Sequence, residues 1–206
     1  MKKFLSVVMV MMFAMVFLAG CAEKPVQDID AAKAAVDSVK AAGAEKYAPE
    51  ALAPVQAKYD EAMAEVQVQE KKFFKNYDKT KQLLGEVKTA SEGAVQAVET
   101  KKEELKQAAI AAETAAAADL AAAVAAVSKA PSGKGTTEDI EAMKADVKAM
   151  EESMPQVKSQ IEAGNYAEAT TLATSISEKS KGVTEQVNAA IAALKKAKGA
   201  KKGAKK

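Results

Sequence analysis

Hydrophobic residues recur at steps of three and four along most of the chain, which is the spacing of one face of an α-helix. The clearest run has the alternation of a coiled-coil seam and consists of Ile140, Met143, Val147, Met150, Met154, Val157 and Ile161. Pro155 interrupts this run and should bend its helix. Similar steps predict further helices over about 28–42, from Pro49 to about Phe73, from Tyr77 to about Ser128 and from Tyr166 to about Leu194.

Glycine and proline mark the ends of these segments. Gly43 ends the first segment, and Pro49 opens the second because proline suits a first helical turn. The run of breakers between Ala130 and Thr136 predicts a loop. The pattern therefore predicts an all-α protein of elongated helical hairpins with antiparallel, coiled-coil-like helices. Its expected parts are a first helix within 21–48, a long hairpin over 49–129, a loop over 130–136, a second hairpin over 137–197 and a disordered Lys-rich tail over 198–206.

The two hairpins share a pattern that indicates an internal repeat. When the helix that begins at Tyr166 is moved back by 89 positions, its seam falls on that of the helix that begins at Tyr77, and Asn precedes both tyrosines. Ser180 then coincides with Ser91. The helices before the two Asn-Tyr pairs align at a shift of 88 instead. Two unrelated amphipathic helices are the alternative interpretation.

The N-terminal segment has the order of a secretory signal. A short cationic start, Met1-Lys2-Lys3, precedes an apolar run of about fifteen residues from Phe4 to Leu18. A helix that spans a bilayer needs about twenty apolar residues. We therefore expect residues 1–20 to be a cleaved signal peptide, with a retained membrane helix as the alternative.

The segment ends in Leu18-Ala19-Gly20-Cys21, which resembles the lipobox of bacterial lipoproteins. The resemblance implies that the Cys21 thiol takes a diacylglyceryl group, that the chain is cut before it and that the new amine is acylated. An aspartate directly after the cysteine would resemble a signal for retention in the inner membrane, but this residue is Ala22. We therefore expect a lipid anchor at the periplasmic face of the outer membrane.

A second resemblance involves the stretch from Ala41 to Leu52, which reads Ala-Ala-Gly-Ala-Glu-Lys-Tyr-Ala-Pro-Glu-Ala-Leu. It is similar to a family of helical bacterial lipoproteins known as domain of unknown function 4398. In that family an alanine-rich helix, a Tyr-Ala-Pro-Glu turn and a second helix lead to an Asn-Tyr or Asp-Tyr turn, which Asn76-Tyr77 fits. The resemblance covers about 21–105. It implies a helical fold and an envelope location, and no activity.

The composition argues against an enzyme. The chain has no His, and its only Cys is Cys21. The paired acids Glu103-Glu104 and Glu151-Glu152 point in different directions on a helix. The loop Gly133-Lys134-Gly135-Thr136 lacks the first glycine, the Ser or Thr after the lysine and the preceding strand of a phosphate-binding loop. We expect no catalytic residues, no metal and no cofactor.

Three surface features are candidates for interactions. The C-terminal lysines carry no acid among them and should bind polyanions, unless they only make the chain soluble: Lys195, Lys196, Lys198, Lys201, Lys202, Lys205 and Lys206. Phe73-Phe74, beside three lysines, is either a contact with a membrane or partner or a hydrophobic plug at the hairpin turn. Met143, Met150 and Met154 either fill the hairpin's own seam or form an adaptable surface for a partner.

These expectations lead to two functions. The first is an outer-membrane-anchored periplasmic lipoprotein with a structural or tethering role in the cell envelope. Its partners would be the membrane, through the lipid on Cys21, and peptidoglycan or anionic lipid headgroups; an exported protein does not meet nucleic acid. The alternative is a helical adaptor or chaperone-like binding module that holds an envelope protein in a complex.

Overall fold

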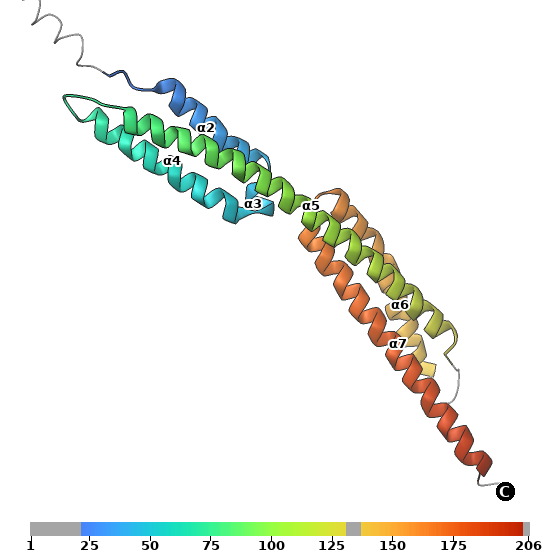
Figure 1. Ribbon diagram of the computed structural model, residues 1–206. Coiled ribbons are helices and arrows are strands. Elements are labelled where there is room, and N and C mark those ends of the chain that lie inside the picture. Colours follow the sequence, from blue (N-terminus) through green and yellow to red (C-terminus); the bar gives the residue numbers. More distant parts are fainter. Residues whose placement is uncertain (1–21, 131–136, 204–206) are drawn as a thin grey trace, which may run out of the picture. The chain divides into compact units, whose positions relative to one another are not determined.

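The computed structural model of the protein describes residues 22–130 and 137–203, with side chains described up to Lys196 except at 137 and 138. The regular structure of these residues consists of helices without a strand, which confirms the all-α prediction (Figure 1). The helices are α2 (Val26–Ala41), α3 (Ala44–Tyr47), α4 (Pro49–Glu70), α5 (Asp78–Ser128), α6 (Thr137–Glu162) and α7 (Tyr166–Gly203).

The chain forms two compact units, and α5 contributes to both. Unit 1 ends at Lys102 and unit 2 begins at Glu103. Unit 1 therefore contains α2, α3, α4 and the first half of α5, whereas unit 2 contains the second half of α5 with α6 and α7. The sequence analysis placed its border at the loop 130–136 instead. A change of packing partners in the middle of a helix leaves the helical periodicity intact. The sequence pattern therefore does not mark the border between the units.

Unit 1 is held together by a narrow core of valine and alanine. Leu84 is fully buried and has the largest side chain among the fully buried residues. The same core cluster contains residues of α2, α4 and α5, together with Ala44 of α3 and Ala48 just before α4: Ala32, Val36, Val39, Ala44, Ala48, Val55, Ala62, Val87, Ala94 and Val98. Because these side chains are small, the helices can lie close together, and little bulk is needed to fill the space between them.

The turn between α2 and α3 depends on one glycine. Gly43 has a φ of +94°, a left-handed conformation that glycine adopts without a steric penalty. A Cβ atom at this position would also lie 2.9 Å from the Tyr47 ring. Pro49 then occupies the first turn of α4, as expected from its fixed φ.

The hairpin of unit 1 breaks between Glu70 and Asp78. The Asn76 backbone N–H donates to Gln69 Oε1 at 3.2 Å, and Asn76 Oδ1 accepts from the Asp78 backbone N–H at 2.8 Å. The second bond satisfies a free donor at the start of α5. These two bonds explain why α4 and α5 are separate helices.

The hairpin of unit 2 also has an Asn-Tyr pair at the start of its last helix, but its turn is shorter. Gly164, with a φ of +74°, separates α6 from α7. The Asn165 side-chain amide donates to Gln160 Oε1 at 2.6 Å, and Tyr166 is buried at the start of α7. The resemblance between the hairpins extends along the first part of the seams, where seven aligned pairs are buried in both: Tyr77 and Tyr166, Thr80 and Ala169, Leu84 and Ala173, Val87 and Ile176, Ser91 and Ser180, Ala94 and Val183, Val98 and Val187. The last two aligned pairs, Lys101 with Ala190 and Leu105 with Leu194, are not buried.

Each hairpin also belongs to a unit with a helix that precedes it in the chain. In unit 1 this helix is α2, and in unit 2 it is the second half of α5. Asp119 on α5 accepts a hydrogen bond from the Ser177 hydroxyl on α7 at 2.5 Å. The same carboxylate forms an ion pair with Lys181 at 3.3 Å. The repeated unit therefore has three helices, whereas the sequence analysis considered only the hairpin.

One expectation about a helix end differs from the structure. The backbone of α7 continues to Gly203, through residues that the sequence analysis assigned to a disordered tail. Alanine and lysine both favour a helix, and Gly199 alone does not end it. Pro155 lies inside α6, which runs on to Glu162, and the bend expected at this proline stays a prediction.

Candidate functional site

Most of the functional residues expected from the sequence lie outside the described residues. These are Cys21 and the lipobox residues Leu18, Ala19 and Gly20, together with the loop 131–136 and the side chains of Lys198, Lys201, Lys202, Lys205 and Lys206. Of the C-terminal lysines, Lys195 and Lys196 have described side chains, and both are exposed on α7. The first described residue is Ala22, directly after the expected site of lipid attachment.

The start of the described chain is fixed against unit 1. The Lys24 ammonium lies 2.7 Å from Glu70 Oε1, and Pro25 is buried. The hydrogen bond with Glu70 raises the pKa of Lys24, and the same bond lowers the pKa of Glu70. Both side chains are more than two fifths exposed, so the ion pair adds little to the free energy of unfolding. Its effect is to position the first described residues. It places the start of the chain beside the end of α4 (Figure 1).

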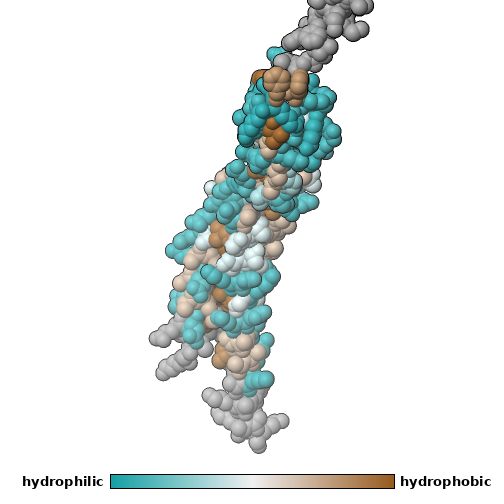
Figure 2. All heavy atoms as spheres, turned by 90° about the vertical axis from the view of Figure 1, so that its left-hand side faces the viewer, coloured by the Kyte–Doolittle hydropathy of each residue, from teal (hydrophilic) through white to brown (hydrophobic). Residues whose placement is uncertain are grey.

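The turn that follows α4 presents two aromatic rings to solvent. Phe73 is 88% exposed and Phe74 is 75% exposed, and their rings meet edge to face with centroids 5.0 Å apart. Lys71, Lys72 and Lys75 on either side are also exposed. Figure 2 shows an apolar patch among hydrophilic residues at this end of unit 1. The interpretation of Phe73-Phe74 as a hydrophobic plug is therefore wrong, because neither ring enters the core.

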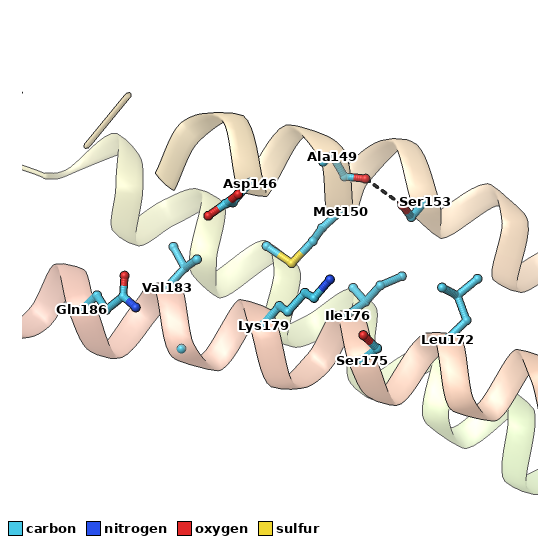
Figure 3. A pocket seen from close by; sticks show the side chains of 11 residues that line it. Asp146, Ala149, Met150, Ser153, Leu172, Ser175, Ile176, Lys179, Val183 and Gln186 are labelled. Atoms are coloured by element: carbon cyan, nitrogen blue, oxygen red, sulfur yellow. Dashed lines mark hydrogen bonds between the residues drawn. The ribbon is translucent and has the colours of Figure 1, made fainter. Parts of the chain in front are cut away.

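A shallow groove of about 430 Å³ lies between α6 and α7 (Figure 3). Its apolar floor is formed by Met150, Leu172, Ile176 and Val183, and Lys179 borders it. Met150 itself is buried and accepts a hydrogen bond from the Ser180 hydroxyl at 3.4 Å. Met150 therefore fills the seam of its own hairpin, which is one of the two interpretations of the methionine stripe, whereas Met143 and Met154 are only partly buried. One edge of this seam lines the groove.

The polar clusters of the described residues have structural explanations. The hydrogen bond from Ser177, with a smaller contribution from Lys181, lowers the pKa of the Asp119 carboxyl and joins α5 to α7. The paired acids at 103–104 and 151–152 are exposed. Among the described residues, no three His, Cys, Asp or Glu side chains are grouped so that they could hold a metal ion.

Helix α5 is long and apolar enough, by length and composition alone, to cross a membrane. An 18-residue window has a mean hydropathy of 1.6, and 22% of this window is buried. In the alanine-rich half, Ala109, Ala116 and Ala123 are fully buried in unit 2. Core helices of soluble proteins also have this length and composition, so we do not infer that α5 spans a membrane.

Comparisons of the chain with protein-family models, with curated proteins and with solved structures found no match. The protein is an α-helical chain with two units that follow each other in the sequence. Each unit contains a helical hairpin and the helix that precedes this hairpin in the chain. The resemblances to the lipobox and to domain of unknown function 4398 remain predictions, based on the residues that carry them.

Proposed function

We propose that the protein is a lipoprotein of the periplasmic face of the outer membrane, with a structural or tethering role in the cell envelope. The observation that carries this proposal is the order of the N-terminal residues, in which an apolar segment leads into Leu18-Ala19-Gly20 and the only cysteine of the chain. One acyl chain binds a membrane only reversibly, whereas two or three chains on Cys21 would hold the protein there.

The described residues support a structural role. The cores of both units consist mainly of alanine, valine and other apolar side chains. The groove between α6 and α7 is shallow, and its polar side chains do not converge on one point. Such an interior supports a role in which each unit acts as a packed helical body. The expected contacts are then with the bilayer through Cys21 and with a polyanion through the C-terminal lysines.

The anchor is tested by two substitutions next to each other. Cys21→Ala should abolish incorporation of labelled palmitate, block the cut before residue 21 and change the fractionation of the protein. Ala22→Asp should leave labelling intact but move the protein from the outer to the inner membrane. A Cys21→Ala protein that is still cut before residue 21 and stays in the membrane would contradict the proposal.

The tether is tested by removing charge from the C-terminal lysines. Deletion of residues 199–206 removes four of the seven lysines, so co-sedimentation of the unlipidated chain with peptidoglycan should fall. Binding of the intact chain should weaken as salt rises, because such charges are screened over about 8 Å at physiological salt. The matched control replaces four exposed lysines of unit 2 by glutamine, at positions 144, 148, 158 and 179. Equal losses in both variants would show that the C-terminal lysines are not the contact.

The groove between α6 and α7 favours a second function, that of a binding module for an envelope protein. A photo-crosslinking amino acid at Leu172, which lines the groove, should then capture a defined protein in cells even in high salt. The same group at Ala189, an exposed position on α7 outside the groove, is the control. Capture at neither position, or equally at both, would count against this function.

A further inference from the structure

The turn after α4 has the composition of a surface that contacts a membrane interface. Phe73 and Phe74 are the most exposed large hydrophobic side chains of the described residues, and Val68 nearby is 49% exposed. Lysines stand on both sides of the rings, and no acid occurs from Lys71 to Tyr77. Phenylalanine side chains of membrane-surface segments enter the boundary between headgroups and acyl chains, and lysines are favourable beside anionic headgroups.

The position of the turn shows which membrane it can reach. The ion pair between Lys24 and Glu70 places the start of the described chain at the end of α4, immediately before the turn (Figure 1). Three peptide units separate Lys24 from Cys21, and they span at most about 11 Å between Cα atoms. A lipid on Cys21 would therefore bring the bilayer surface within reach of the two rings.

We propose that the turn formed by residues 71–76 is a second membrane contact, in which Phe73 and Phe74 enter the interfacial layer of the leaflet that holds the lipid on Cys21. Lys71, Lys72 and Lys75 lie at the anionic headgroups of the same leaflet. This inference rests on the proposed lipidation of Cys21. It deepens that function because it sets how unit 1 meets the bilayer.

A weak contact is sufficient at this place. The anchor confines the turn near the bilayer at an effective concentration on the order of millimolar, so the second contact forms within the same molecule. With one flexible attachment, unit 1 would be free to rotate on its lipid. With two contacts at the same end, this end of α4 faces the headgroups and the Gly43 end of unit 1 points away from them.

The test uses the absence of tryptophan from the chain. Phe74→Trp introduces a single fluorophore at an exposed position in the turn, and Ala53→Trp introduces one at an exposed position about 25 Å away along α4. Each lipidated full-length mature protein is reconstituted into vesicles of phosphatidylglycerol and phosphatidylcholine with brominated acyl chains. We expect bromine to quench Trp at position 74 at least several-fold more than Trp at position 53, with a blue shift of the emission at position 74.

A further variant separates the lysines from the rings. Replacement of Lys71, Lys72 and Lys75 by glutamine in the Phe74→Trp protein should reduce quenching in anionic vesicles and change little in vesicles of phosphatidylcholine alone. Because all these side chains are exposed, none of the substitutions should alter the helical core.

Mass spectrometry of each preparation distinguishes the two ways of failure. If Cys21 carries lipid and the protein sediments with the vesicles, but both tryptophans are quenched equally, the turn is not a membrane contact and the anchor stands. A protein partner for the rings would give this result. If Cys21 carries no lipid and the protein stays in solution, the proposed function fails and this inference fails with it.

Discussion

The replacement of Leu84 by alanine tests whether unit 1 depends on the core described above. Leu84 is fully buried in α5, and its neighbours in the core are mostly valine and alanine. Leu83, the adjacent residue, is only partly buried and packs at the edge of the same core. The two substitutions Leu84→Ala and Leu83→Ala remove the same atoms from the same helix, so only their burial differs.

The expected costs follow from that burial. Leu→Ala substitutions in a core cost about 2–5 kcal/mol, the larger values where the surroundings cannot move into the space. Short side chains such as valine and alanine have little reach, so we expect about 3–4 kcal/mol at Leu84. At Leu83 much of the side chain is already in water, and we expect about 1 kcal/mol. Alanine's higher helix propensity offsets a few tenths of a kcal/mol in both variants.

Urea unfolding of the unlipidated chain measures this difference. With a slope of about 2 kcal/mol per molar urea, a difference of about 2 kcal/mol moves the midpoint by about 1 M. Helical circular dichroism follows the whole chain, whereas the tyrosine signal follows mainly unit 1, which contains Tyr47, Tyr59 and Tyr77. Equal shifts in the two variants would show that the α5 face assigned here to the core is not buried.

Three further pairs or single changes test other parts of the structure. Gly43→Ala should destabilise by about 1 kcal/mol or more because its φ is positive, whereas Gly85→Ala, with open space at its Cβ, should stabilise by about 0.5–1 kcal/mol in thermal unfolding. Val147→Asp should destabilise far more than Lys148→Asp, since only the first places a charge in the seam. Asp119 has a lowered pKa, so its contribution is present above about pH 4 and is lost as pH falls; Asp119→Asn should lower the unfolding free energy at pH 7, and the difference should shrink below about pH 4.

Helix type and the ends at Gly43 and Pro49 were predictable because local rules determine them, whereas the end of α7 was not. Val147, Met150 and Val157 belong to a run of apolar residues spaced by three and four, which indicates a buried helix face. All three residues are buried. Gly43 and Pro49 act through backbone conformation, which does not depend on distant residues. The sequence pattern therefore sufficed for the elements and for the face that each one buries.

The division into units and the accessible turn were not predictable in the same way. The helical repeat of α5 continues through Lys102 and Glu103, where the packing partners change. Phe73-Phe74 fits a plug as well as an exposed tip in sequence, since hydrophobicity alone does not state which side of a turn faces the core. The bonds that join Gln69, Asn76 and Asp78 settle the direction of the turn, and they depend on side-chain geometry.

The two units keep the same buried positions but fill them with different side chains, and this difference limits where function can lie. At aligned positions Leu84 corresponds to Ala173, and Thr80, whose buried hydroxyl has no hydrogen-bond partner, corresponds to Ala169. The same buried position holds leucine in one unit and alanine in the other. These buried positions are therefore not shaped to fit one particular ligand. Surfaces that the repeat does not share are therefore the candidates for specific recognition. The Phe73 turn is such a surface, because the corresponding turn of unit 2 contains only Ala163 and Gly164-Asn165. Its longer, aromatic and cationic sequence occurs in unit 1 alone, as the proposed membrane contact beside Cys21 requires.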